Sequence, residues 1–195
     1  SETQQTLVLN GLRGQVVLQV DGQLKTGRDI VLMAMLGAEE YGFATAALIV
    51  LGCVMMRKCN QNTCPVGVAT QNPELRRRFT GLSEYLVNYF TFLAREVREY
   101  LAEIGVEKMD DIIGRTDLII RKPDDGIRKH QLINFDKVLA RVDNEAALRH
   151  VTDQQHGIEH VKDVEMLHAA ADAVNEQKEV SLEYTIANTD RAYIW

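Results

Sequence analysis

The sequence contains few prolines, a single tryptophan and very few cysteines. Its three cysteines all lie between positions 53 and 64. An odd and tightly clustered set of cysteines does not form the paired framework of a disulfide-rich secreted domain. The first residues also lack the basic and apolar segments of a secretory signal. We therefore predict a cytoplasmic protein, in which the cysteines suit a metal or cluster site better than disulfides.

An excess of positive charge and a long apolar run are also missing. The chain has 22 basic and 28 acidic residues and a net charge of -6, whereas nucleic-acid binding relies on clustered lysine and arginine. The most apolar run, residues 43–56, would rise only about 21 Å as a helix, short of the ~30 Å core of a bilayer. We expect neither a nucleic-acid partner nor a membrane span, and we assign this run to a buried core.

Strand-like and helical patterns alternate in the first part of the chain. Thr26, with Asp29 three residues later, resembles a capping box at a helix start, and Gly37 suits the end of that helix. This order of elements is typical of a parallel α/β sheet or barrel. The predicted elements are a strand over residues 15–20, a helix over 29–36, a short strand over 39–43 and a helix over 45–51.

Apolar residues at steps of three and four predict the clearest helix of the chain over residues 83–104. Residues 121–153 have the composition of an extended connector. A smaller helix is predicted over 163–177, and residues 181–187 have the pattern of a strand. His156 and His160, four residues apart, have a spacing that binds zinc on some helices, but surface histidines explain them better because no HExxH context surrounds them.

Two predicted strand-to-helix loops carry features of an anion site. Gly22 lets backbone N–H groups approach an anion closely, and Lys25 and Arg28 add positive charge beside it. Residues 42–46 repeat this order of strand end, small residues and helix start. Adjacent loops of this kind hold phosphate after the seventh and eighth strands of many barrels. On spacing alone, two ordinary turns explain the same pattern.

The cysteines follow the spacing Cys53-x5-Cys59-x4-Cys64. Zinc sites usually use close pairs and four ligands, and ferredoxin motifs supply four thiolates. Three thiolates suit a three-iron cluster that lacks one protein ligand. Arg57 and Lys58 would offset part of the negative charge of such a cluster. Zinc, with a histidine from elsewhere, and plain packing of cysteines in a core are the alternatives that spacing leaves open.

Five stretches of the sequence resemble signature segments of the glutamate synthase large subunit. The resemblance runs over nearly the whole chain, and its cysteine segment is the most specific part. The family's large subunit also has an N-terminal cysteine nucleophile and earlier barrel strands. This sequence contains no counterpart of either, so we expect the chain to be a piece of such a subunit. The stretches are DGQLKTGRD (21–29), GAEEYGFATAALIVLGCVMMRKCNQNTCPVGVATQ (37–71), IIGRTDLI (112–119), QQHGIEH (154–160) and EYTIANTDRA (183–192).

The resemblance implies an α/β fold made of the last βα units of a (βα)8 FMN-binding barrel. A cysteine loop, a long helix and an extended connector would follow. The expected parts are the end of the barrel with the cysteine loop (1–70), a helical segment that closes the barrel (71–120), and a connector that leads into a β-helix domain (121–195).

The resemblance also implies which residues bind cofactors. Cys53, Cys59 and Cys64 would ligate a 3Fe-4S cluster. Lys25 would contact the FMN phosphate or the flavin edge, although a solvated lysine explains it too. Asn60 replaces a histidine that many members have. A role of this position in proton transfer or in setting the reduction potential of the cluster is therefore in doubt. The FMN phosphate would be held by backbone N–H groups of Gly22, Gln23, Ala44 and Thr45, where Gln23 and Ala44 replace common glycines.

The family reaction makes two glutamates from glutamine, 2-oxoglutarate and two electrons. Ammonia from a separate amidotransferase domain condenses with 2-oxoglutarate, and reduction takes place at FMN. Electrons reach FMN through the cluster from ferredoxin or from an NAD(P)H-oxidising small subunit. No catalytic residue is assigned to this chain. The alternative is a non-catalytic metal-binding module, for zinc or an iron–sulfur cluster, that folds against a partner.

Overall fold

The structure is a computed structural model that describes residues 1–122, 126–142, 144–153, 157, 161–188 and 190. Contacts divide the chain into two compact units, residues 1–153 and 154–195. All the candidate site residues belong to the first unit. The division into three parts that the resemblance implies stays a prediction. No helix within the described residues has both the length and the apolar character needed to cross a membrane.

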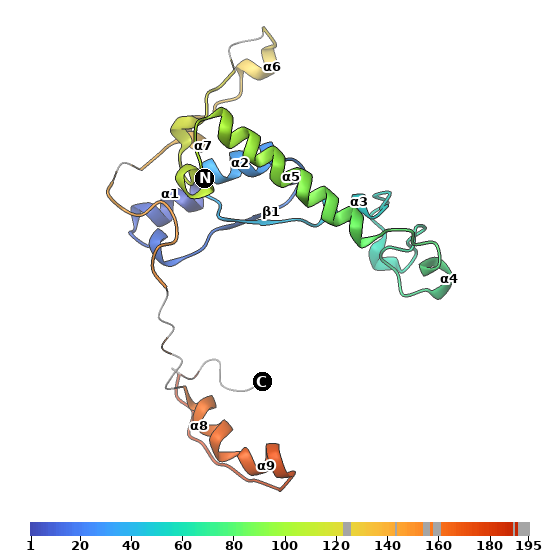
Figure 1. The fold of residues 1–195 in the computed structure, drawn as a ribbon. Helices are drawn as coiled ribbons and strands as arrows, with labels where there is room; N and C mark the ends of the chain where they lie inside the picture. The colour runs from blue at the N-terminus through green and yellow to red at the C-terminus, as the bar shows by residue number, and fades with distance from the viewer. Residues whose placement is uncertain (123–125, 143, 154–156, 158–160, 189, 191–195) are drawn as a thin grey trace. The chain divides into compact units, whose positions relative to one another are not determined.

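The first unit is built around two parallel strands joined by a helix (Figure 1). β1 and β2 pair in parallel, with Asp21 opposite Gly42. This confirms a mixed α/β structure with a parallel strand pair, and the complete barrel stays a proposal. The elements are α1 (Glu2–Leu9), η1 (Arg13–Gln15), β1 (Gln19–Asp21), α2 (Gly27–Met35), β2 (Glu40–Gly42) and α3 (Thr45–Val50).

The cysteine segment and a long helix follow the strand pair. Helix α5 lies alongside α2 and extends past α3 (Figure 1), and it confirms the predicted helix over 83–104 within one residue. Two helices of four residues interrupt the segment expected to be an extended connector. The elements are η2 (Cys59–Gln61), α4 (Pro73–Arg76), α5 (Ser83–Glu103), η3 (Met109–Ile112), η4 (Thr116–Leu118), α6 (Arg128–Gln131) and α7 (Asp136–Leu139).

Helix α2 forms where the capping box was predicted. The Thr26 hydroxyl accepts a hydrogen bond from the Asp29 backbone N–H at 3.2 Å, and the Asp29 carboxylate accepts one from the Thr26 N–H at 3.0 Å. The buried face of α2 packs against α5 and η3. The resulting core consists of Leu24, Ile30, Val31, Ala34, Met35, Val97, Leu101 and Ile112.

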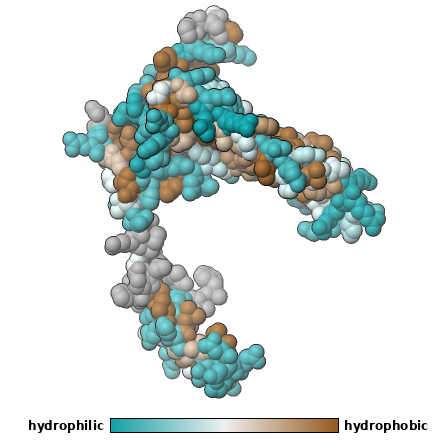
Figure 2. Space-filling view, in the orientation of Figure 1, coloured by the Kyte–Doolittle hydropathy of each residue, from teal (hydrophilic) through white to brown (hydrophobic). Residues whose placement is uncertain are grey.

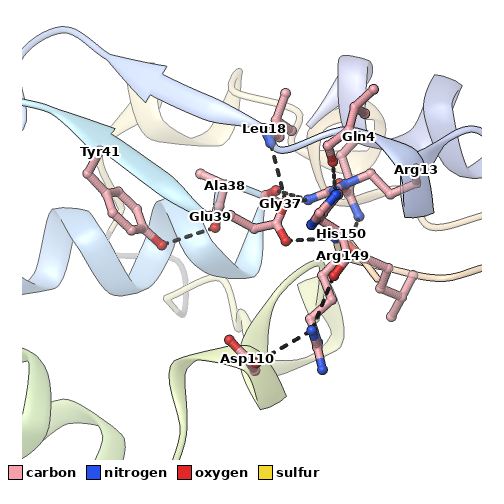
Figure 3. A network of polar contacts seen from close by, with 12 residues as sticks. Gln4, Arg13, Leu18, Gly37, Ala38, Glu39, Tyr41, Asp110, Arg149 and His150 are labelled. Carbon is pink, nitrogen blue, oxygen red and sulfur yellow. Dashed lines mark hydrogen bonds and ion pairs between the residues drawn. The ribbon is translucent and has the colours of Figure 1, made fainter. Parts of the chain in front are cut away.

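A buried polar network anchors the start of the strand pair (Figure 3). The Arg13 side chain is fully buried and pairs with Glu39 at 2.6 Å, just before β2. Arg13 also donates to Gln4 of α1 at 2.5 Å, and His150 donates its backbone N–H to Glu39 at 2.7 Å. The strand predicted over residues 15–20 is wrong for most of its length, because Gln15 belongs to η1, residues 16–18 are in neither helix nor strand, and β1 covers only Gln19–Asp21. The turn at η1 brings the Arg13 guanidinium inward, and the strand begins only after it.

The expectation that residues 43–56 form a buried core is wrong for most of the run. Only Ala46 is buried, while Ile49, Val54 and Met56 are exposed. Figure 2 shows brown, apolar surface along the part of the unit formed by α3 and the first half of α5. Helix α3 packs against α5 on one side, and no other described helix or strand packs as closely against its remaining faces.

The second unit contains α8 (Lys162–Ala169) and α9 (Ala171–Glu176). The single helix predicted over 163–177 is therefore two helices. The predicted strand over 181–187 is wrong, because no described segment pairs with it and an isolated strand has no hydrogen-bond partner. Lys162 instead pairs with Asp190 at 2.7 Å, across this extended segment. His156 and His160 lie outside the described residues.

Candidate functional site

The two loops predicted to bind an anion lie side by side at one edge of the strand pair. Because β1 and β2 are parallel and Asp21 faces Gly42, the residues that follow each strand leave the sheet at the same edge. The close approach depends on Gly42, since a Cβ there would lie 2.9 Å from the Asp21 side chain. In the first loop, Gly22 and Gln23 both have a positive φ, of 104° and 61°.

Protein carboxylates already satisfy most backbone N–H groups at the start of α2. The N–H groups of Lys25 and Thr26 donate to Asp29 at 3.0 Å each, and the Gly27 N–H donates to Glu96 of α5 at 2.7 Å. The Gly22 N–H donates to the side chain of Asp21 at 2.6 Å. Within the described residues, the N–H of Gln23 has no acceptor. An anion at the first loop would thus be held by Gly22 and Gln23, after Asp21 releases the Gly22 N–H.

The second loop leads into a helix whose start has no cap. The N-cap residue of α3 is Ala44, which offers no side-chain acceptor. The N–H groups of Ala44 and Thr45 make no hydrogen bond in the described part of the chain. Uncapped N–H groups at a helix start favour an anion. Ala44 has a φ of -113°, so the replacement of the common glycine causes no strain there.

Charge beside the loops comes from Lys25, Arg28 and Asp29. The Lys25 side chain is exposed and forms no ion pair with any described residue. Burial acts to raise the pKa of Asp29, but the hydrogen bonds from Lys25, Thr26 and the Thr26 hydroxyl, together with Arg28, lower it overall. Asp29 is therefore an anion that serves the α2 cap, while Lys25 and Arg28, both exposed and without an ion pair to any described residue, are the cations left for a ligand.

The three cysteines line one small pocket of about 20 Å³. Cys64 is buried, Cys53 is half-buried and Cys59 is exposed, and all three are free thiols. A pocket of this volume holds about one water molecule, so a cluster requires the loop to open. In the described part of the chain, no group of three or more His, Cys, Asp or Glu side chains has the geometry to hold a metal ion.

The backbone around Cys64 favours its thiolate form. The N–H of Ala69 is the largest influence that lowers the pKa of Cys64; burial opposes it, and the N–H groups of Val66, Val68 and Gly67 add to the lowering. Cys53 accepts a hydrogen bond from the Met55 N–H at 3.4 Å. The donor set of three sulfurs, one of them stabilised as an anion, suits a thiophilic metal or cluster.

Backbone strain concentrates in the two regions predicted to bind cofactors. Five described residues other than glycine have a positive φ. Three of them, Met55, Arg57 and Asn62, lie in the cysteine loop, and a fourth, Gln23, lies in the first anion loop. Such conformations cost roughly 1–3 kcal/mol each and are typical of functional sites.

Asn62, which braces the cysteine loop, was not among the residues predicted from the sequence. Asn62 accepts hydrogen bonds from Thr70 at 2.7 Å and from the Gln71 N–H at 2.6 Å, which fixes the chain on both sides of Cys64. The only signal in the sequence that could have pointed to Asn62 is the tendency of asparagine to adopt a left-handed backbone conformation. Asn62 and Thr70, with Cys59, also line an open cavity of about 730 Å³.

The same chain matches known proteins along nearly its whole length. The family model described as a conserved region in glutamate synthase matches residues 1–107. A glutamate synthase (NADPH) large chain from Bacillus subtilis is 47% identical over 98% of this chain. A glutamate synthase (NADH) from Schizosaccharomyces pombe is 44% identical over 98%, and a ferredoxin-dependent glutamate synthase from Oryza sativa is 46% identical over 98%.

The chain spans only a small share of those relatives, namely 13% of the Bacillus protein, 9% of the Schizosaccharomyces protein and 12% of the Oryza protein. The match nevertheless includes both loops of the strand pair and all three cysteines, since the family model covers residues 1–107. The chain therefore belongs to the glutamate synthase family.

Proposed function

We propose that this chain supplies the FMN-phosphate loops and the iron–sulfur ligands of a glutamate synthase. The enzyme would make two glutamates from glutamine and 2-oxoglutarate, and so assimilate ammonia nitrogen. The relatives' names support an oxidoreductase of this kind. The observation that carries the proposal is the concentration of left-handed residues other than glycine in the first anion loop and the cysteine loop.

The FMN phosphate would be bound at the shared edge of β1 and β2. The N–H groups of Gly22 and Gln23 would donate from one side and those of Ala44 and Thr45 from the other. Three of these four N–H groups have no acceptor among the described residues, and the fourth, that of Gly22, donates to Asp21. Lys25 would add a positive charge. The flavin supplies the redox chemistry when bound, and the chain's part is to hold it in place. These loops would follow the last two strands of a barrel.

Cys53, Cys59 and Cys64 would ligate a 3Fe-4S cluster that passes electrons toward FMN. The residues fit by their chemistry, because three cysteines line one pocket and backbone N–H groups lower the pKa of the Cys64 thiol. The exposed position of Cys59 would give an electron donor access. That donor would be ferredoxin or an NAD(P)H-oxidising subunit, since relatives of each kind match equally well. Three free thiols are compatible with the cytoplasmic location that we propose.

Anaerobic reconstitution of the chain with iron and sulfide tests the cluster. We expect about three irons per chain and the low-temperature EPR signal of an oxidised three-iron cluster. Cys59→Ser should abolish the signal, whereas Ser83→Ala, at the start of α5, should leave it unchanged. One stoichiometric zinc with no iron and no flavin in the folded chain would instead support a non-catalytic metal-binding module.

A further inference from the structure

The two phosphate loops are joined by more than the strand pair that precedes them. The ladder between β1 and β2 contains only three residue pairs, Gln19–Glu40, Val20–Tyr41 and Asp21–Gly42. Beyond it, the loop residues Gly22, Gln23 and Ala44 are exposed. Donors from two separate loops must reach the same phosphate within about 0.5 Å of their productive positions. Something besides the ladder has to fix the loops relative to each other.

Helix α5 contacts both loops through adjacent residues of one turn. The Tyr89 hydroxyl donates a hydrogen bond to the carbonyl of Lys25, a residue of the first loop, at 2.8 Å. The Phe90 ring meets the Phe43 ring edge to face, with 5.2 Å between centroids and 85° between planes, and Phe43 opens the second loop. The Tyr89 and Phe90 rings also contact each other at 5.1 Å.

A third contact lies further along the same helix. The Glu96 carboxylate accepts the Gly27 N–H at 2.7 Å, where the first loop enters α2. The packing is close, because a Cβ on Gly27 would lie 2.7 Å from the Val97 nitrogen. Burial, with the charges of Asp29 and Glu96 nearby, raises the pKa of Tyr89, so its hydroxyl keeps its proton and stays a donor.

We propose that Tyr89 and Phe90 are positioning residues that clamp the two loops into a single site for the phosphate monoester of a flavin nucleotide. This inference rests on the proposed function and adds the residues that give the loops their mutual geometry. The clamp lies on the helix that follows the cysteine loop, so α5 also links the chain after Cys64 to the phosphate loops. Edge-to-face pairs and net hydrogen bonds are each worth about a two- to tenfold effect on an equilibrium.

The test compares four variants of the full chain in two measurements. Tyr89→Phe removes only the hydroxyl donor, and Phe90→Leu removes only the ring pair. The matched controls on the same helix are Tyr85→Phe and Phe92→Leu, because both rings are exposed and, among the described residues, no hydrogen bond or ring contact joins them to either loop; Phe92 contacts Arg95 of its own helix. The measurements are hydrogen exchange of residues 22–27 and 48–51, where the Leu48 and Leu51 N–H groups are hydrogen-bonded in α3 directly after the second loop, and the dissociation constants of FMN and riboflavin, which differ only in the phosphate.

We expect Tyr89→Phe to speed exchange in the first loop and Phe90→Leu to speed it in residues 48–51, which follow the second loop. Each should weaken FMN binding by roughly fivefold and leave riboflavin binding unchanged, while both controls match the wild type. General destabilisation would weaken both ligands together and would count against the proposal. Variants that keep the wild-type preference for FMN and normal exchange would overturn it. A wild-type chain without any preference for FMN would refute the phosphate assignment itself, before any variant is compared.

Discussion

Replacement of Arg13 by methionine tests the buried network that anchors the strand pair (Figure 3). Arg13 is fully buried, and besides Glu39 and Gln4 its guanidinium donates to the carbonyls of Val16 at 2.7 Å and Gly37 at 3.1 Å. The substitution leaves the Glu39 carboxylate, whose side chain is 13% exposed, without its cation.

Removal of one partner of a buried ion pair costs roughly 3–5 kcal/mol. Glu39 keeps the N–H groups of Leu18 and His150 as donors, at 3.3 and 2.7 Å. We therefore expect a loss at the lower end, about 3 kcal/mol of the free energy of unfolding. Such a loss is a large share of the roughly 5–15 kcal/mol that stabilises a typical domain.

Urea unfolding followed by circular dichroism measures this loss, with the slope expected to stay constant. Arg13→Met combined with Glu39→Gln should regain about 1–2 kcal/mol, since no unpaired charge is then buried. Arg141→Met is the control, because Arg141 forms an exposed ion pair with Asp117 that is worth at most about 1 kcal/mol. The reasoning is refuted if Arg13→Met costs no more than the control, or if the double variant is no more stable than the single one.

Three further substitutions test the loops and the α2 cap. Gln23→Gly relieves a left-handed φ and should raise the melting temperature by about 2–4 °C, and a fall would contradict the strain. The folded-state pKa of Asp29 is lowered, so its contribution to stability is present above about pH 4 and is lost as the pH falls further. Asp29→Asn should accordingly cost about 1 kcal/mol in urea unfolding at pH 7 and less at pH 3, and an equal cost at both would refute the cap. Gly27→Ala should destabilise the chain by roughly 1–3 kcal/mol in thermal melting, because its methyl group would meet the Val97 backbone, and a neutral effect would contradict the packing of α2 on α5.

The elements that sequence analysis predicted well are those fixed by local signals. The capping box of Thr26 and Asp29 sets the start of α2, and the apolar stripe before Gly105 sets α5. Helix α1 was missed because its apolar residues 7–9 are consecutive and form no stripe. Its position depends on Gln4, which donates to the Leu148 carbonyl at 2.8 Å across 144 residues of sequence. No local pattern encodes such a contact.

The candidate site divides in the same way. The spacing of the cysteines and the composition of the two loops are visible in the sequence, so the residues nominated from it are those that the structure brings to one pocket and one sheet edge. The contact of Tyr89 with Lys25 spans 64 residues and depends on how α5 packs. The exposure of most of residues 43–56 could not be predicted from the sequence either. Hydropathy measures how apolar a segment is, but it does not show which other segments pack against it.

The unequal burial of the three cysteines sets an order in which air and peroxide would damage the chain. Cys59 faces solvent, Cys53 is partly screened, and Cys64 lies inside its turn of backbone. Oxidation requires solvent access as well as thiolate character, and the burial of Cys64 withholds the sulfur whose thiolate is favoured, so ageing of a preparation should begin as a sulfenic acid or a mixed disulfide at the exposed Cys59. A reductant added early would reverse that first lesion, whereas the inner sulfur would be spared until the loop opens.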